Sequence, residues 1–196
     1  MAHYEIINGV AILPEGIEMI EDKAFWNCKE LKRVVIPQWV RRIGEGAFYG
    51  CENLEVVELP EWLEDIGHGA FGYCYSLKEL TLPPWVKRIE ECAFYRCSSL
   101  QNLSIPSSVT HIGDCAFSGC TSLTQICLPP SVTSIGYETF WGCKSLTQIS
   151  LPPSVTSIGD WAFYECTSLT LVKVSKNTEL TGYAFRNCPN AKIERY

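Results

Sequence analysis

Histidine is scarce in this chain of 196 residues, which contains only His3, His68 and His111. None of the three has a nearby or periodic set of partners that would form a catalytic triad or a metal cluster. The phosphate-binding loops Gly-x-x-x-x-Gly-Lys and Gly-x-Gly-x-x-Gly are also missing. The sequence therefore predicts no catalytic residues, no metal ligands and no cofactor, and we do not expect an enzyme.

Positive charge and long apolar runs are lacking as well. The chain has 16 Lys and Arg against 22 Asp and Glu, a formal charge of -6, which argues against a nucleic acid held by phosphate contacts. No apolar run approaches the ~20 residues of a membrane helix, so no membrane insertion is expected. Residues 1–20 lack a basic start followed by an apolar core, so no signal peptide is recognised.

Cysteine, in contrast, is abundant and regularly spaced. Eight of the eleven cysteines recur every 23 residues, the last of them one residue early. An Ala-Phe or Thr-Phe pair precedes most of them, and a Leu three residues later follows most of them. Such a period predicts a repeat solenoid, in which one coil buries its apolar face only against its neighbours. The periodic cysteines are Cys28, Cys51, Cys74, Cys97, Cys120, Cys143, Cys166 and Cys188.

The repeat unit predicts the course of one coil. In residues 123–128, Ile126 and Leu128 alternate with Gln125 and Cys127, which is typical of a short strand with the first pair inward. Stacked coils would then form a parallel sheet along one face. A Pro-Pro turn at 129–130 ends the strand, and Val132-Thr133-Ser134-Ile135-Gly136 places a second apolar pair inside.

The return segment at 116–120 is expected to form a single helical or 3₁₀ turn, with Phe117 filling the interior. We therefore expect an α/β-type, right-handed solenoid of about eight coils. The predicted inward residues are Phe48, Leu54, Val57, Leu59, Phe71, Leu77, Leu80, Leu82, Phe94, Leu100, Phe117, Leu123, Ile126, Leu128, Phe140, Leu146 and Ile149.

Residues 1–196 are expected to form one domain with modified ends. An Asn8-Gly9 pair between apolar runs predicts a hairpin, so residues 1–23 are interpreted as an N-terminal cap with a partial repeat. The full repeats span 24–174. Residues 175–196 are interpreted as a C-terminal cap, because Ser175 replaces the turn proline and Ala191 replaces the expected leucine.

These residues resemble the BspA-like leucine-rich repeat family, whose unit reads roughly Ala-Phe-x-x-Cys-x-x-Leu-x-x-Ile-x-Leu-Pro-x-Ser-Val-x-x-Ile-Gly. The resemblance covers about residues 11–188, and residues 151–159 fit it closely. It implies a curved solenoid with a binding or adhesion role, at the cell surface of a bacterium or protist or in secreted form. It implies no catalytic residues.

The periodic cysteines are expected to be buried free thiols. Neighbouring coils repeat at ~4.8 Å, whereas the Cβ atoms of a disulfide lie about 3.5–4.5 Å apart. Cys92 and Cys115 lie in a variable column that we expect to be exposed. A disulfide or metal site that joins them to Cys97 and Cys120 is the open alternative. Cys127 should project from the sheet.

A column of tryptophans is the main candidate for a binding site. Trp39, Trp62 and Trp85 recur at 23 residues, each two residues after a turn proline, with Arg41, Glu64 and Lys87 beside them. Exposed tryptophan is enriched in binding hot spots. The alternative is that the rings only cover the turn prolines Pro37, Pro60 and Pro83. A second candidate site lies on the sheet face, at Asn102, Gln125 and Gln148.

Two hypotheses about function follow. The chain is a non-enzymatic binding module for a protein or glycan partner, or it is a structural spacer or engineered scaffold with no specific ligand.

Overall fold

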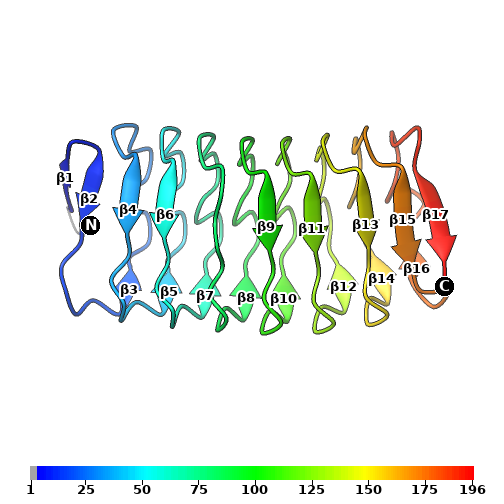
Figure 1. Cartoon of the computed structure of the whole chain (residues 1–196), viewed down its shortest axis with the longest axis horizontal. Coiled ribbons are helices and arrows are strands. Elements are labelled where there is room, and N and C mark those ends of the chain that lie inside the picture. Colours follow the sequence, from blue (N-terminus) through cyan, green and yellow to red (C-terminus); the bar gives the residue numbers. More distant parts are fainter. Residues whose placement is uncertain (1–3) are drawn as a thin grey trace.

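The computed structural model describes residues 4–196 and shows a single stack of coils along one axis (Figure 1). The hairpin of β1 (Glu5–Ile7) and β2 (Val10–Ile12) begins the stack, and these two strands pair antiparallel. Asn8 and Gly9 form its turn with φ of 52° and 84°, so the predicted hairpin is confirmed. Residues 1–3 of the predicted cap, including His3, lie outside the described residues.

A parallel sheet runs along one broad face, as predicted. Ile126 lies directly beside Leu103 of the preceding coil and is buried, whereas its neighbours Gln125 and Cys127 are exposed. The strands of this front face are β4 (Arg33–Val35), β6 (Val56–Glu58), β9 (Asn102–Ser104), β11 (Gln125–Cys127), β13 (Gln148–Ser150), β15 (Leu171–Val174) and β17 (Lys192–Arg195).

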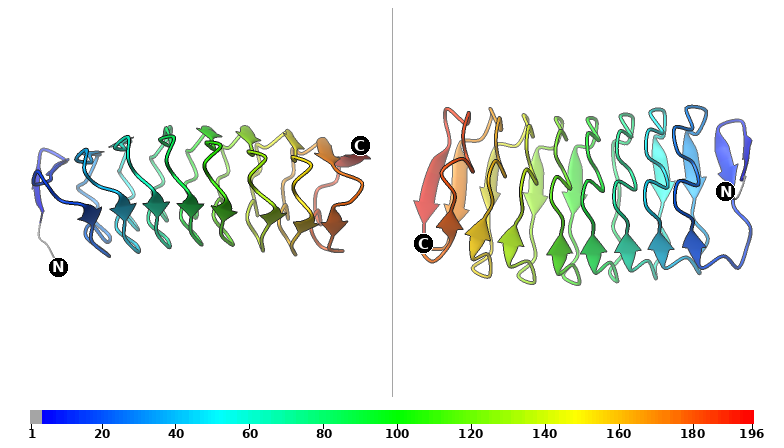
Figure 2. Two further views of the ribbon diagram at one scale, coloured as in Figure 1. Left: turned by 90° about the horizontal axis from the view of Figure 1, so that it is seen from below. Right: turned by 180° about the vertical axis from the view of Figure 1, so that it is seen from behind.

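A second parallel ladder of two-residue strands follows the opposite side of the stack (Figure 2). The Val-x-x-Ile-Gly segments predicted an inward apolar pair there, and Val132 and Ile135 are indeed buried. The strands themselves were not predicted. They are β3 (Met19–Ile20), β5 (Arg42–Ile43), β7 (Asp65–Ile66), β8 (Arg88–Ile89), β10 (His111–Ile112), β12 (Ser134–Ile135), β14 (Ser157–Ile158) and β16 (Glu179–Leu180).

The prediction of a helical or 3₁₀ return segment was wrong. Residues 4–196 contain turns and strands and no helix. In the return segment, Cys115 and Gly119 have φ of 56° and 76°, which a right-handed helix does not accommodate. Backbone donors also alternate: Ser118 N–H donates within its own coil to Cys115 O at 3.0 Å, whereas Phe117 N–H donates to Thr139 O of the next coil at 2.9 Å. Half of the donors thus bind a neighbouring coil.

No helix in the described part of the chain is long and apolar enough to cross a membrane.

The core is built on a column of phenylalanines. All eight phenylalanines of the chain stack in succession from Phe25 to Phe185, with ring centroids 5.0–5.6 Å apart. Tyr4 extends the column at its N-terminal end, 5.2 Å from Phe25. The predicted inward residues are all buried except Leu59, which is half-buried and lines a surface hollow beside residues 79–81.

Four contacts between central coils lack one of the two strand ladders. On the front face, residues 79–81 form no strand with β6 and only a single bridge, Glu79 to Asn102, with β9, and β11 is not paired with β13. On the back face, β10 is not paired with β12. Each contact keeps its other ladder, through β7 with β8, β8 with β10, β12 with β14, and β9 with β11. Shallow surface hollows lie at the same four places. The stack is therefore continuous but unevenly joined.

Candidate functional site

The tryptophan strip consists of Trp39, Trp62 and Trp85, each on the turn between a front strand and a back strand. The three side chains are 54%, 42% and 48% exposed, while the turn prolines Pro37, Pro60 and Pro83 are buried. Trp62 and Trp85 stack with centroids 5.6 Å apart and planes at 23°. Within the described residues, Trp39 makes no such ring contact with Trp62. The strip thus leaves about half of each indole to solvent on three consecutive coils.

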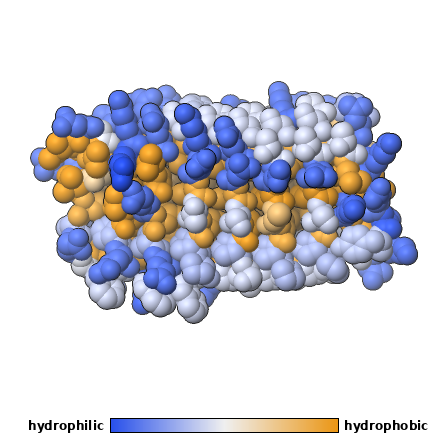
Figure 3. Space-filling view, viewed as in Figure 1, coloured by the Kyte–Doolittle hydropathy of each residue, from blue (hydrophilic) through white to orange (hydrophobic). Residues whose placement is uncertain are grey.

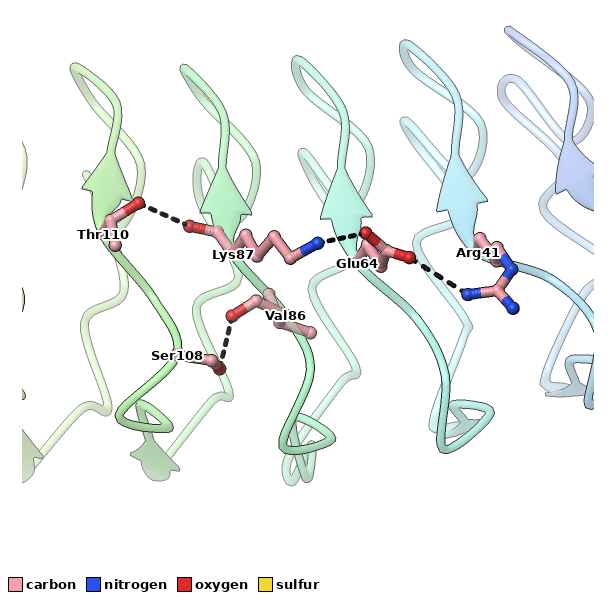
Figure 4. Close-up of polar contacts among 6 residues, drawn as sticks. All are labelled: Arg41, Glu64, Val86, Lys87, Ser108 and Thr110. Carbon is pink, nitrogen blue, oxygen red and sulfur yellow. Dashed lines mark hydrogen bonds and ion pairs between the residues drawn. The ribbon is translucent and has the colours of Figure 1, made fainter.

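The predicted charged residues beside the strip form one row across the same coils. Arg41 Nη1 lies 3.0 Å from Glu64 Oε1, and Lys87 Nζ donates to Glu64 Oε2 (Figure 4). These hydrogen bonds, first from Lys87 and then from Arg41, lower the pKa of Glu64. One carboxylate thus faces two cations, and the row carries a net positive charge next to an aromatic surface.

In later coils, hydroxyl residues replace tryptophan in this column and gain a structural role that the sequence did not suggest. Ser108 Oγ donates to Val86 O of the preceding coil at 2.7 Å (Figure 4). Ser154 Oγ donates likewise to Val132 O at 2.7 Å. The same bond recurs at Ser131 and Thr178. This column therefore carries exposed tryptophans in three coils. In the later coils it carries hydroxyl residues that donate a hydrogen bond to the preceding coil.

Ser108→Ala should lower the free energy of unfolding by about 0.5–1.5 kcal/mol, the usual net value of one intramolecular hydrogen bond. Urea denaturation of the purified chain measures this loss. Ser107→Ala is the matched control, because Ser107 is adjacent and exposed and its hydroxyl donates no such bond. Equal losses of stability in the two variants would show that the hydrogen bond from Ser108 to Val86 does not contribute to stability.

The alternative site on the sheet face is only partly assembled. Asn102 and Gln125 lie opposite each other on paired strands β9 and β11, and Thr124 Oγ1 lies 3.2 Å from Asn102 Oδ1. Gln148 lies on β13, across the interrupted ladder, and a hollow of about 460 Å³ separates its strand from that of Gln125. Figure 3 shows this face with a hydrophobic band along its middle and hydrophilic side chains on its flanks.

A second aromatic surface was missed by the sequence reasoning. Trp26 stacks on Tyr49 at 4.2 Å, and Tyr73 makes edge contacts with Tyr49 and Tyr95 at 5.1 and 5.3 Å. We call these four residues the aromatic ridge; the Arg96 guanidinium packs over its last ring at 5.5 Å. The sequence pattern that could have predicted this ridge is the residue after each Ala-Phe pair, which is aromatic in most coils.

Glycine allows the ridge to continue where that column lacks an aromatic residue. A Cβ at Gly72 would lie 2.8 Å from Tyr49 Cδ2, so the Tyr49 ring occupies the space of the missing side chain. Tyr73, one position later, then supplies the next ring. Because the aromatic residue of this coil is shifted by one position, from 72 to 73, the aromatic column does not follow a strict 23-residue period.

All eleven cysteines are free thiols, and the six central members of the periodic column are buried as predicted. Each of the six thiols donates to the carbonyl of a phenylalanine in the preceding coil, as Cys97 Sγ does to Phe71 O at 3.1 Å. The bonds recur at Cys51, Cys74, Cys120, Cys143 and Cys166. Burial raises the pKa of Cys51 and Cys120 to about 12.

The predictions for four of the other cysteines need correction. Cys28 and Cys188 are half-buried, because each lies in a terminal coil that is covered on one side only. Cys92 and Cys115 are also half-buried, where exposure was expected. Cys127 is exposed, as predicted. The Cys97 and Cys120 thiols point to phenylalanine carbonyls in the core, which separates them from Cys92 and Cys115.

The two described histidines each lie near a glutamate, His68 Nδ1 at 3.9 Å from Glu91 and His111 Nε2 at 3.8 Å from Glu90. Over residues 4–196, no group of three or more His, Cys, Asp or Glu side chains is placed to hold a metal ion.

A stack of 23-residue coils, with parallel strands on one face and a Phe and Leu core, defines a leucine-rich repeat solenoid. The chain belongs to the BspA type leucine rich repeat family, whose model matches residues 8–113 and 64–192 with six copies. Proteins of this family and fold are generally non-enzymatic. No curated protein matches the chain.

Solved structures of bacterial leucine-rich repeat proteins share this fold. The leucine-rich repeat protein of T. pallidum is 36% identical with a TM-score of 0.79, covering 83% of this chain and 78% of its own. A protein from Bacteroides ovatus is 28% identical with a TM-score of 0.70, covering 91% and 59%. A leucine rich cell surface protein from Faecalibacterium prausnitzii is 26% identical with a TM-score of 0.61, covering 89% and 62%. This chain thus spans less than two thirds of the last two proteins.

Proposed function

We propose that the protein is a non-enzymatic binding or adhesion module that presents the tryptophan strip to a protein or glycan partner. The observation that carries this proposal is the exposure of three consecutive indoles on one edge of the stack, at 54%, 42% and 48%. Tryptophan contributes large contact area at low entropic cost, and contiguous exposed apolar surface commonly marks an interaction site.

The neighbouring charges suit the same role. Arg41, Glu64 and Lys87 hold one another in place, and the two cations keep further donors for a ligand that lies along the strip. A protein or glycan partner would then combine contacts to the aromatic rings with hydrogen bonds to this charged row. The periodicity of both rows favours an elongated partner that follows the axis of the stack.

A location at the cell surface, of a bacterial or protist type, belongs to the same proposal. It is supported by the relative from Faecalibacterium prausnitzii, which is described as a cell surface protein.

The triple variant Trp39→Ser, Trp62→Ser, Trp85→Ser should weaken binding by at least ~30-fold, since hot-spot residues contribute about 2 kcal/mol or more each. Serine is chosen because the later coils carry it in this column with a hydrogen bond to the preceding coil. The measurement is a binding screen of wild type against glycans and matrix proteins, followed by the affinity of each hit for the variant.

Trp161→Ser is the matched control, because Trp161 is also exposed, at 36%, but lies in another column. Retained binding with lowered thermal stability in the triple variant would leave the strip a structural role. The site would then be sought on the sheet face with Gln125→Ala and Gln148→Ala. A wild-type chain that binds nothing would support the alternative of a spacer or scaffold.

A further inference from the structure

Cys92 and Cys115 occupy the same column in adjacent coils and share one backbone conformation, with φ of 56° at both. Cys92 N–H donates to Asp114 O at 2.9 Å, so the two backbone segments are in direct contact. Two residues further on, Phe94 and Phe117 stack with centroids 5.5 Å apart. Residues in one column of adjacent coils repeat at ~4.8 Å, which lies within the Cα separation that disulfides span, about 4.4–6.8 Å.

The two thiols also face each other. A hydrogen bond between them is the main cause that lowers the pKa of Cys92 and raises that of Cys115. Acidic groups surround the pair: Glu91, Asp114 and Glu138, with Cys115 Sγ 3.8 Å from Glu138 Oε2. Both cysteines are half-buried, so they are open to a small reagent.

The other cysteines are placed differently. The six central thiols of the periodic column are buried, and each is bonded to a phenylalanine carbonyl. Cys127 projects from the sheet face, where its strand neighbour is Ser104. Cys28 and Cys188 are half-buried in the terminal coils, and Cys188 neighbours the buried Cys166 and also donates to Phe163 O at 2.9 Å. In the described part of the chain, Cys92 and Cys115 are thus the pair of neighbouring thiols that both lie outside the buried column.

We propose that Cys92 and Cys115 form a redox modification site, at which a small-molecule disulfide converts the two thiols into a reversible disulfide between adjacent coils. The Cys92 thiolate attacks one sulfur of oxidised glutathione, which breaks that S–S bond and releases one glutathione thiolate. Cys115 then loses its proton and attacks the mixed disulfide at Cys92, which releases the second. Two protein thiols are oxidised, one disulfide reagent is reduced, and two protons leave.

The bond should be easy to reverse. Residues in one column of a stack repeat at ~4.8 Å, whereas the Cβ atoms of a disulfide prefer about 3.5–4.5 Å. Closing the bond must draw the two coils together against their backbone contacts. Strained disulfides have more oxidising potentials and are reduced more readily than structural ones.

The test is to incubate the native chain with oxidised glutathione, block the remaining thiols with iodoacetamide, and map the products by tandem mass spectrometry. We expect a peptide pair joined through Cys92 and Cys115, and its loss when millimolar reduced glutathione is added. Cys92→Ser and Cys115→Ser should each abolish the cross-link and leave a glutathione adduct on the remaining cysteine.

Cys127→Ser is the control and should leave the cross-link unchanged. Stable glutathione adducts on both Cys92 and Cys115 without a bond between them would overturn the proposal. A cross-link to Cys97 or Cys120, a bond between two molecules, or no reaction in the folded wild type would overturn it equally. The product formed by the wild-type chain is enough to decide whether the proposal holds, so the test does not depend on the folding of a variant.

Discussion

Phe94→Ala should lower the free energy of unfolding by about 3–5 kcal/mol, the usual cost of removing a buried aromatic ring. Phe94 is fully buried and stacks between Phe71 and Phe117, 5.5 Å from each and nearly parallel to both. The coils cannot collapse into the resulting cavity, because backbone bonds such as Phe94 N–H to Ala116 O, at 2.8 Å, set their spacing. Equilibrium denaturation in urea measures the loss.

Phe185→Ala is the control within the same column. Phe185 stacks on Phe163 on one side only, and it is half-buried in the terminal coil. Its removal should therefore cost clearly less than that of Phe94. A loss below about 1 kcal/mol at Phe94 would mean that the phenylalanine column does not carry the core.

Cys120 in the native chain should react with thiol reagents at pH 8 at least ~1000-fold more slowly than an ordinary cysteine. Burial raises the pKa of its thiol from 9.0 to about 12, the thiolate is the reactive form, and each pKa unit costs about tenfold in thiolate. The rate should increase about tenfold per pH unit up to about pH 12. Timed labelling followed by mass spectrometry measures the rate at each site.

Exposed Cys127 is the internal reference, and in denaturant all eleven cysteines should react alike. Rapid native labelling of Cys74 or Cys120 would contradict the buried column. The same pKa shift affects stability, because the pKa of the Cys120 thiol is higher in the folded chain than in the unfolded chain. The contribution of this thiol to the free energy of unfolding is therefore complete below about pH 9 and is lost as pH rises towards 12. Urea midpoints should therefore fall in alkali.

The 23-residue period predicted the parts of the fold that depend on burial. The alternation of apolar and polar residues around Ile126 predicted the front strand. The recurring Phe and Cys predicted the core column, because buried positions tolerate few residue types. The return segment was not predictable in the same way. Its left-handed positions are filled by residues as different as Cys115, Trp161 and Gly119, so no single residue type marked the turns.

The candidate site was predicted less completely than the fold. The spacing of Trp39, Trp62 and Trp85 placed them in one column, but ring contact between two of them and not the third depends on side-chain rotamers, which a period does not encode. The two-residue back strands were too short for a pattern of alternation. Their pairing follows from the stacking of whole coils.

The interrupted ladders also determine how the stack would respond to tension along its axis. The hydrogen bonds within one contact between two coils share such a force. Successive contacts along the stack each bear the full force, because they are in series. The stack therefore extends most at the contacts with the fewest hydrogen bonds. Those places are the contacts of residues 79–81 with β6 and with β9, of β10 with β12, and of β11 with β13. Under a pulling force the chain would therefore behave as stiff segments linked by four compliant joints, and would yield first in its middle while its two ends stayed closed.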